Sequence, residues 1–124
     1  MSDRNLQKDV LSIFFTLYIQ MKTYHFETKI YNRHYNVDTY LENYSKLYDR
    51  FIEVSMGHFG PINMGKYTIT IEQVNDDNIH QIAKQFTLIL KELRNLFKEY
   101  SDLLNIIDEI DAETNQLIYK LKLI

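Results

Sequence analysis

Four segments of this chain carry apolar residues at steps of three and four positions, which places those side chains on one face of an α-helix. In the first segment the pattern is formed by Val10, Phe14, Leu17, Met21 and Tyr24. The expected helices run from about Asp3 to Thr28, from His34–Val37 to Met56, from Asp76 or Asp77 to Tyr100, and from Ser101 onward. The sequence therefore predicts an all-α fold built as a four-helix bundle.

A segment of about twenty residues separates the second and third expected helices. Residues 57–77 contain the only proline and all three glycines, and Gly57 is expected to end the second helix. Structureless loops of this length are uncommon in small domains unless they have a task, and a crossover between the two ends of a bundle is such a task. We expect the crossover at about residues 58–76. Within it, Tyr67–Ile71 alternates β-branched residues and predicts a short extended strand.

Length and composition narrow the classes of protein further. At 124 residues the chain is expected to form one domain over residues 1–124. It has no cysteine, so disulfides and thiolate metal sites are excluded. Its net charge is −3, and without a basic stripe no tight DNA binding is expected. No secretory signal and no apolar run long enough for a membrane span are visible, so a cytoplasmic location is expected.

The stretch from Tyr24 to Glu53 contains five side chains that commonly bind metal ions: His25, His34, Asp38, Asp49 and Glu53. The last four follow one another at intervals of four, eleven and four, which on a helix places them within roughly a 100° arc. Histidine with carboxylate is a typical ligand set for iron, manganese or zinc. However, Asp38 and Glu53 would lie roughly 22 Å apart on one helix. The stripe is therefore a coincidence, two separate sites, or half of a site that a second copy completes.

Simpler interpretations exist for each of these residues. His25 continues the buried face of the first helix by one turn, where a histidine is commonly a boundary residue of the core. The acidic residues of the second helix have lysine neighbours, and Glu42 with Lys46 is spaced for a helical ion pair. Asp77 and His80 are spaced for a metal pair but lie in a capping turn, where a helix cap beside a surface histidine is the favoured interpretation.

The same stretch resembles the Dps proteins (DNA-binding proteins from starved cells) of the ferritin-like superfamily, and also Dps-like proteins of large DNA viruses. In Dps proteins the first helix ends with histidine and an aromatic residue, as in Tyr24-His25-Phe26 here. The second helix carries His-x-x-x-Asp and, eleven residues after that aspartate, Asp-x-x-x-Glu. This chain has His34–Asp38 and Asp49–Glu53 at those intervals. The resemblance is sharp over about residues 17–57.

The resemblance implies a ferritin-like bundle, with the long crossover between its second and third helices, and a ferroxidase site shared by two subunits. By that resemblance, His25, Asp49 and Glu53 of one chain meet His34 and Asp38 of its partner. Fe(II) is then oxidised by peroxide or O₂ at a di-iron or mononuclear site. Iron storage and protection from peroxide are the implied roles, with a homodimer at minimum and a dodecameric shell as the larger assembly.

Two further hypotheses remain open at this stage. The same intersubunit site could hold zinc or manganese without turnover, because the ligand sets overlap. Alternatively, the chain could be a non-catalytic ferritin-like module that works as a structural or virion-associated interaction protein. If the protein is viral, host cytoplasm or virion are its expected locations.

Overall fold

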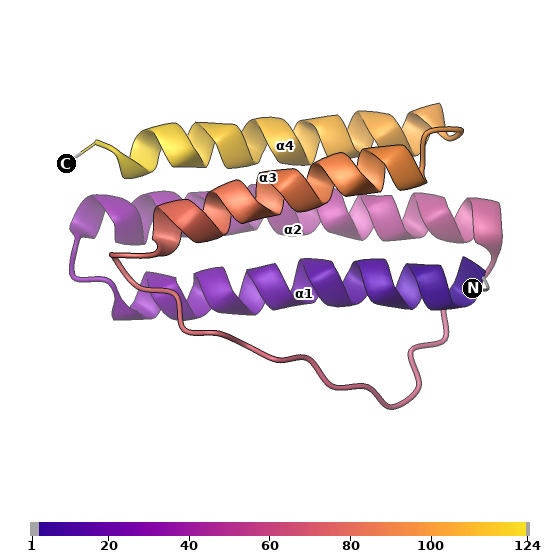
Figure 1. Cartoon of the computed structure of the whole chain (residues 1–124), viewed down its shortest axis with the longest axis horizontal. Helices are drawn as coiled ribbons and strands as arrows, with labels where there is room; N and C mark the ends of the chain where they lie inside the picture. The colour runs from indigo at the N-terminus through magenta and orange to yellow at the C-terminus, as the bar shows by residue number, and fades with distance from the viewer. Residues whose placement is uncertain (1–2, 124) are drawn as a thin grey trace.

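Four long helices account for most of the chain in a computed structural model, which describes residues 3–123 (Figure 1). The helices are α1 (Asp3–Glu27), α2 (Tyr31–Phe59), α3 (Ile79–Leu96) and α4 (Ser101–Leu121). The prediction of an all-α four-helix bundle is confirmed, and residues 3–123 contain no β-strand. Helix α2 runs antiparallel to α1, the crossover returns to the starting end of α2, and α3 therefore runs parallel to α2 (Figure 1).

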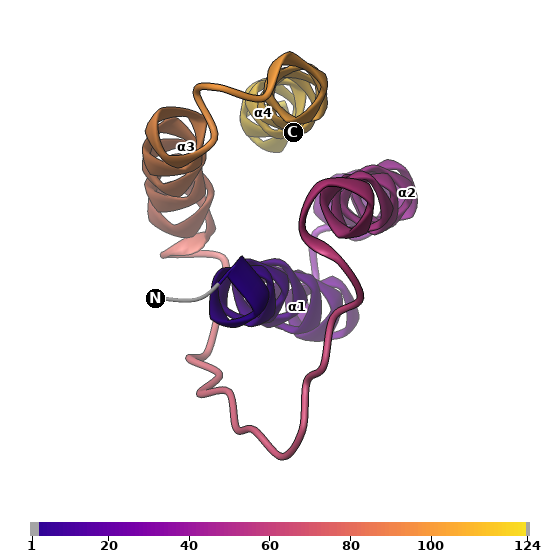
Figure 2. The ribbon, with the colours of Figure 1, turned by 90° about the vertical axis from the view of Figure 1, so that its right-hand side faces the viewer.

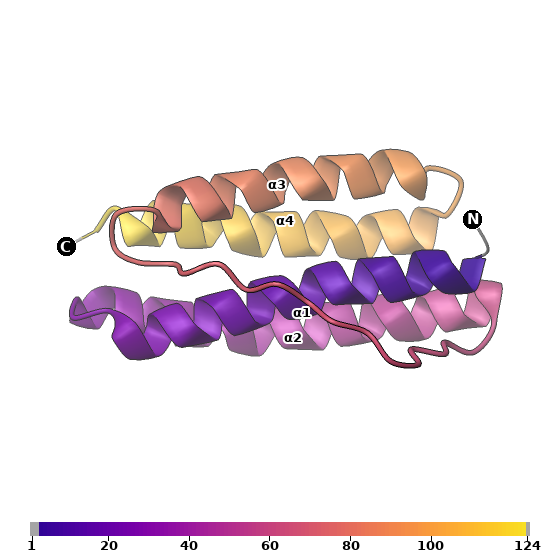
Figure 3. The same ribbon diagram turned by 60° about the horizontal axis from the view of Figure 1, so that its bottom comes forward.

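The helices stand at the four corners of the bundle when it is viewed along its axis (Figure 2). Three neighbouring pairs pack directly, namely α1 with α2, α2 with α4, and α3 with α4. On the fourth side, between α1 and α3, the crossover passes along the outside of α1 for most of its length (Figure 3). Three sides of the bundle are thus closed by helix packing, and the fourth is bordered by the crossover.

Aromatic side chains hold α1 against α2. Phe14 contacts Tyr44, Tyr48 and Phe51, with ring centroids 6.2, 5.7 and 5.5 Å away. Tyr44 is fully buried, and its hydroxyl donates a hydrogen bond of 2.8 Å to the Phe14 carbonyl. Burial raises the pKa of Tyr44 well above its ordinary value, so the hydroxyl stays protonated and remains a donor. Pairing this hydroxyl avoids the cost of an unsatisfied polar group in the core.

The second helix is longer than the apolar pattern predicted. It begins at Tyr31, because the turn after α1 occupies only residues 28–30. The prediction that Gly57 ends the helix is wrong, since α2 continues to Phe59. Gly60 ends it instead, with φ of 95°, and its N–H donates to the Met56 carbonyl. A glycine in the left-handed region is a common helix stop, whereas glycine inside a helix costs only about 1 kcal/mol relative to alanine.

The crossover and the start of α3 also differ from the prediction. Tyr67–Ile71 forms no strand and lies in an extended segment along α1. The expected caps, Asp76 and Asp77, do not cap α3. Instead the Asn75 side-chain oxygen accepts hydrogen bonds from the backbone N–H groups of Asp77 and Asn78 at 2.9 and 3.0 Å. Asparagine readily makes such turns, so Asn75 closes the turn that precedes α3, while Asn78 occupies the N-cap position without a side-chain cap hydrogen bond.

The last two boundaries shift by a few residues. Helix α3 ends at Leu96 rather than at Tyr100, and Phe97 leads the chain out of it. Tyr100 occupies the N-cap position of α4, and Ser101, expected as the cap, is the first helical residue. Apolar periodicity continues through such turns because Phe97 is buried, which explains why the pattern overestimates the length of α3.

Asp76 fixes the end of the crossover to the turn between α1 and α2. Its Oδ1 accepts hydrogen bonds of 2.7 Å from the hydroxyls of Thr28 and Tyr24. Arg33 donates to the Asp76 carbonyl at 3.1 Å and lies 3.6 Å from its carboxylate. The hydrogen bonds from Thr28 and Tyr24 hold the pKa of Asp76 below its ordinary value. At the other end of the crossover, Gln7 donates to the Gly60 carbonyl at 3.3 Å.

Replacing Asp76 with alanine should destabilise the protein by about 1–2 kcal/mol, since two hydroxyls lose a charged acceptor and Arg33 loses an ion-pair partner. Because the pKa of Asp76 is lower in the folded state, its contribution is present above the unfolded value of about 3.9 and is lost as pH falls through the folded value. Urea unfolding of Asp76→Ala should therefore show a smaller loss of stability on acidification than wild type. The exposed neighbour Asp77→Ala is the matched control. Equal unfolding free energies for the two variants would contradict this assignment.

Candidate metal site

The three-residue turn between α1 and α2 brings His25 and His34 face to face. His25 lies in the last turn of α1, and His34 lies in the first turn of α2. Their rings stack with centroids 3.9 Å apart and planes inclined by 17°. His25 is buried, whereas His34 is partly exposed. The close pairing comes from the shortness of the turn, which places the end of one helix beside the start of the next.

Each histidine donates a hydrogen bond to the backbone of the other. His25 Nδ1 lies 2.7 Å from the His34 carbonyl oxygen, and His34 Nδ1 lies 2.7 Å from the His25 carbonyl oxygen. A carbonyl oxygen only accepts, so the proton of each hydrogen bond belongs to Nδ1. In the neutral rings both Nε2 atoms then carry a lone pair. Histidines that bind metals commonly have this arrangement, with the other ring nitrogen donating to a carbonyl.

Asp38 follows His34 by one helical turn and completes the cluster. Its Oδ1 lies 3.8 Å from His25 Nε2 and 2.9 Å from the ammonium group of Lys22. The hydrogen bond from Lys22 is the main reason that the pKa of Asp38 lies below its ordinary value, with the nearby charge of Lys22 and the two histidines adding to it. The side chain is 55% exposed. Asp38 is thus a carboxylate that already holds a cation beside a histidine lone pair.

Asp49 and Glu53 lie farther along α2 and are exposed. At the rise of a helix they are roughly 16 and 22 Å from Asp38, so they do not reach the histidines of their own chain. Among the described side chains, residues 6–123, no group of three histidine, aspartate or glutamate side chains is arranged to hold a metal ion. One chain stacks His25 on His34 and places Asp38 3.8 Å from His25, and it leaves Asp49 and Glu53 apart.

This grouping differs from the division of residues that the resemblance implies, in which His25 belongs with Asp49 and Glu53, opposite His34 and Asp38 of the partner. In the structure of one chain, His25 stacks on His34 of the same chain. The reason is the turn of residues 28–30, which is too short to separate them.

An exposed aromatic side chain, Phe26, lies beside the cluster, and further exposed apolar side chains lie on α1 and α2. Phe26 is 71% exposed and Tyr35 is 60% exposed, and Ile19 lies exposed on α1. The Phe26 ring lies 5.0 Å from the ring of His25, and the Lys22 ammonium lies 5.4 Å from the Phe26 centroid. Exposed apolar groups gathered in one place commonly mark a contact surface rather than a solvated one.

Two polar clusters escaped the sequence analysis because their members are far apart in the chain. The Asp76 network joins residues separated by up to 52 positions. His58 and Asp102, 44 positions apart, pair at 2.9 Å, and this hydrogen bond lowers the pKa of Asp102. His80, considered with Asp77 as a metal pair, instead lies 3.4 Å from Arg33, and burial together with the Arg33 charge lowers its pKa.

The comparisons with known proteins give one positive result. The family of unknown function DUF5856 matches residues 25–121. The chain belongs to this family. The match includes His25, His34, Asp38, Asp49 and Glu53, and most of the four helices. No curated protein and no solved structure matches the chain. No helix within residues 3–123 is long and apolar enough to cross a membrane.

We expect nuclear magnetic resonance to find both His25 and His34 as the Nδ1–H tautomer near pH 8. Long-range ¹H–¹⁵N correlation spectra distinguish a protonated from an unprotonated ring nitrogen directly. His80 should show the same tautomer, because its Nε2 faces the donor Arg33 Nη2. A protonated Nε2 on neutral His25 or His34 would show that the reciprocal hydrogen bonds do not form.

Proposed function

We propose that this protein is a Dps-like ferroxidase whose metal site is completed by a second copy of the chain. Fe(II) is the substrate, and peroxide or O₂ is the oxidant. The observation that carries the proposal is the division of the candidate ligands. His25 of α1 lies beside His34 and Asp38 of α2, with both Nε2 lone pairs uncommitted to the backbone, while Asp49 and Glu53 lie exposed farther along α2.

The positions of the ligands on α2 favour a two-fold arrangement. The pairs His34–Glu53 and Asp38–Asp49 share one midpoint in the sequence, between Asn43 and Tyr44. If two α2 helices pack antiparallel about an axis at that midpoint, each His34 lies level with a partner's Glu53 and each Asp38 with a partner's Asp49. An isologous contact of this kind generates two identical sites per dimer.

The topology and the surface both support this assembly. One long crossover with α2 parallel to α3 is the connectivity of ferritin-like bundles (Figure 1). Phe26 supplies exposed apolar area beside His25, and Ile19 and Tyr35 are further exposed apolar side chains of α1 and α2. A stable dimer needs about 800 Å² per partner, and these side chains would form part of it. A dodecameric shell that stores oxidised iron is the larger assembly within the same proposal.

Each residue has a role that follows from its chemistry. The carboxylates of Asp38 and Glu53 offset the charge of the cation, and the histidine nitrogens are borderline ligands suited to iron in both oxidation states. Asp49 either binds the metal or orients a neighbouring ligand. The reciprocal hydrogen bonds hold the rings of His25 and His34 before any metal arrives. The Lys22 ammonium pairs with the Asp38 carboxylate in the structure, and it must move away before a metal cation can bind that carboxylate.

One observation favours a second candidate function. Within a single chain, His25 and His34 each donate a hydrogen bond to the backbone carbonyl of the other, and Asp38 forms an ion pair with Lys22. These contacts would also suit a non-catalytic module in which the cluster fastens α1 to α2. In that case the protein would act as a structural or virion-associated interaction protein, or would hold zinc or manganese without turnover.

Complementation between inactive variants tests the shared site. Glu53→Ala and His34→Ala should each abolish rapid Fe(II) oxidation in stopped-flow absorbance, with helical content unchanged, because both residues are partly or fully exposed. In a mixed dimer one site carries both substitutions and the other carries neither. Activity should therefore return to about a quarter of wild type after random subunit exchange.

His25→Ala distinguishes the two ways of dividing the site. Mixed with Glu53→Ala it should restore activity, and mixed with His34→Ala it should not, since the two histidines lie in one half. Mass spectrometry verifies the exchange. If every mixture stays inactive although exchange is complete, the site is not shared between chains.

Removing Lys22 should strengthen metal binding. In Lys22→Met the Asp38 carboxylate loses its internal cation, and the exposed pair is worth at most about 1 kcal/mol, so we expect a gain of about two- to fivefold in affinity. Equilibrium dialysis with Zn(II) measures this gain without requiring turnover. Lys98→Met, an exposed lysine after α3, is the control. Unchanged or weaker Zn(II) binding by Lys22→Met would argue that Asp38 is not a ligand.

A further inference from the structure

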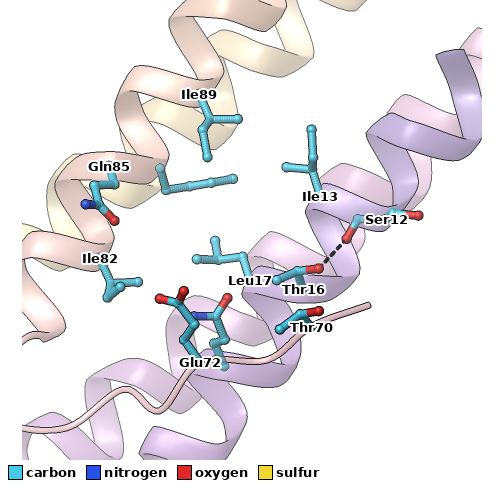
Figure 4. Close-up of a pocket in the computed structure, with 11 residues that line it drawn as sticks. Ser12, Ile13, Thr16, Leu17, Thr70, Glu72, Ile82, Gln85 and Ile89 are labelled. Carbon is cyan, nitrogen blue, oxygen red and sulfur yellow. Dashed lines mark hydrogen bonds between the residues drawn. The ribbon is translucent and has the colours of Figure 1, made fainter. Parts of the chain in front are cut away.

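The side of the bundle between α1 and α3 contains a cleft of about 390 Å³ (Figure 4). Helix α1 contributes one wall and α3 the other, while Thr70 and Glu72 of the crossover border it (Figure 4). The cleft lies where the direct helix packing of the other three sides is missing. Its volume is within the range of sites that bind small organic molecules.

The floor of the cleft is apolar. Five aliphatic or aromatic side chains from the two helices line it: Ile13, Leu17, Ile82, Phe86 and Ile89. Leu17 and Phe86 are buried members of the core, whereas Ile13, Ile82 and Ile89 are only partly buried. Partly buried apolar side chains face one another across this gap. An apolar molecule that fills the gap removes their surface from water, which stabilises the complex.

The polar groups around this floor are biased toward hydrogen-bond acceptors. The hydroxyls of Ser12 and Thr16 donate to carbonyls of their own helix, at 2.8 and 2.7 Å, which leaves their oxygens as acceptors. Glu72 points its carboxylate into the gap between Ile82 and Leu17 (Figure 4). Gln20 and Gln85 add amide groups. No lysine or arginine among the described side chains, residues 6–123, lines the cleft.

We propose that this cleft binds a small molecule with an apolar body and a primary ammonium group. The apolar body occupies the floor between Leu17 and Ile89, and the ammonium group donates its hydrogen bonds to Glu72 and the neighbouring acceptors. An ammonium group has three hydrogen-bond donors and no acceptor, so it is complementary to the carboxylate and hydroxyl oxygens that border the cleft. A fatty acid bound in the same orientation would place its carboxylate against that of Glu72. The repulsion between the two negative charges disfavours the binding of a fatty acid.

This site is separate from the proposed metal site. It shares no residue with His25, His34, Asp38, Asp49 or Glu53. The binding of an ammonium compound there requires neither a metal ion nor a second copy of the chain. Its experiment can therefore fail or succeed without regard to the ferroxidase proposal.

Titrations of ¹⁵N-labelled protein with n-octylammonium, octan-1-ol and octanoate test the proposal, because these probes share one chain and differ in the head group. We expect n-octylammonium to shift the amide resonances of the lining residues with the lowest dissociation constant. Octan-1-ol should bind two- to fivefold more weakly, and octanoate more weakly still. The modest ratio reflects the exposure of Glu72.

Two variants separate the head group from the body. Glu72→Gln should weaken n-octylammonium binding to the level of octan-1-ol and leave octan-1-ol unchanged, whereas Glu92→Gln, an exposed acid on α3 outside the cleft, should change neither. Thr16→Phe, with helical content verified, should fill the cleft and abolish binding of all three probes. Octanoate binding as tightly as n-octylammonium, an unaffected Glu72→Gln, or the absence of shifts for every probe would overturn the proposal.

Discussion

The three-residue turn between α1 and α2 is the constraint on which much of the structure depends. Because only residues 28–30 connect the two helices, the last turn of α1 lies beside the first turn of α2. That proximity stacks His25 on His34 and lets each ring donate to the other's backbone. The same turn supplies Thr28, which holds Asp76 and so fixes where the crossover ends. The direction of α3 follows, since it starts at that end of the bundle.

The chemistry of the proposed site is set by what one chain can and cannot bring together. In the proposal, the histidine pair and Asp38 are one half of the site, and in the structure backbone acceptors fix the ring orientation while Lys22 pairs with Asp38. Asp49 and Glu53 are exposed on the same stripe of α2, out of reach. The shared midpoint of the ligand pairs makes a second copy of the chain the natural source of the other half.

Periodicity in the sequence was enough to predict the four helices and their buried faces, because burial of one face is what the repeat encodes. It did not predict where the helices end. Gly57 was expected to end α2, but the helix ends at Gly60, which has a positive φ and is followed by Pro61, a residue that cannot continue a helix. The Asp76 network and the His58–Asp102 pair join distant positions, and no local pattern signals them. The five candidate ligands were visible as a pattern, but the side of the site on which His25 lies depends on the turn.

A crystal structure of the protein grown with Zn(II), with the ion located by its anomalous scattering, tests the central claim most directly. The account predicts two equivalent peaks per dimer, each about 2.0–2.2 Å from Nε2 of a histidine of the His25–His34 pair and from Asp38 of one chain. The partner subunit's Glu53 should complete each site at a similar distance. Zinc bound only by residues of a single chain, or absent from the histidine pair, would contradict the account.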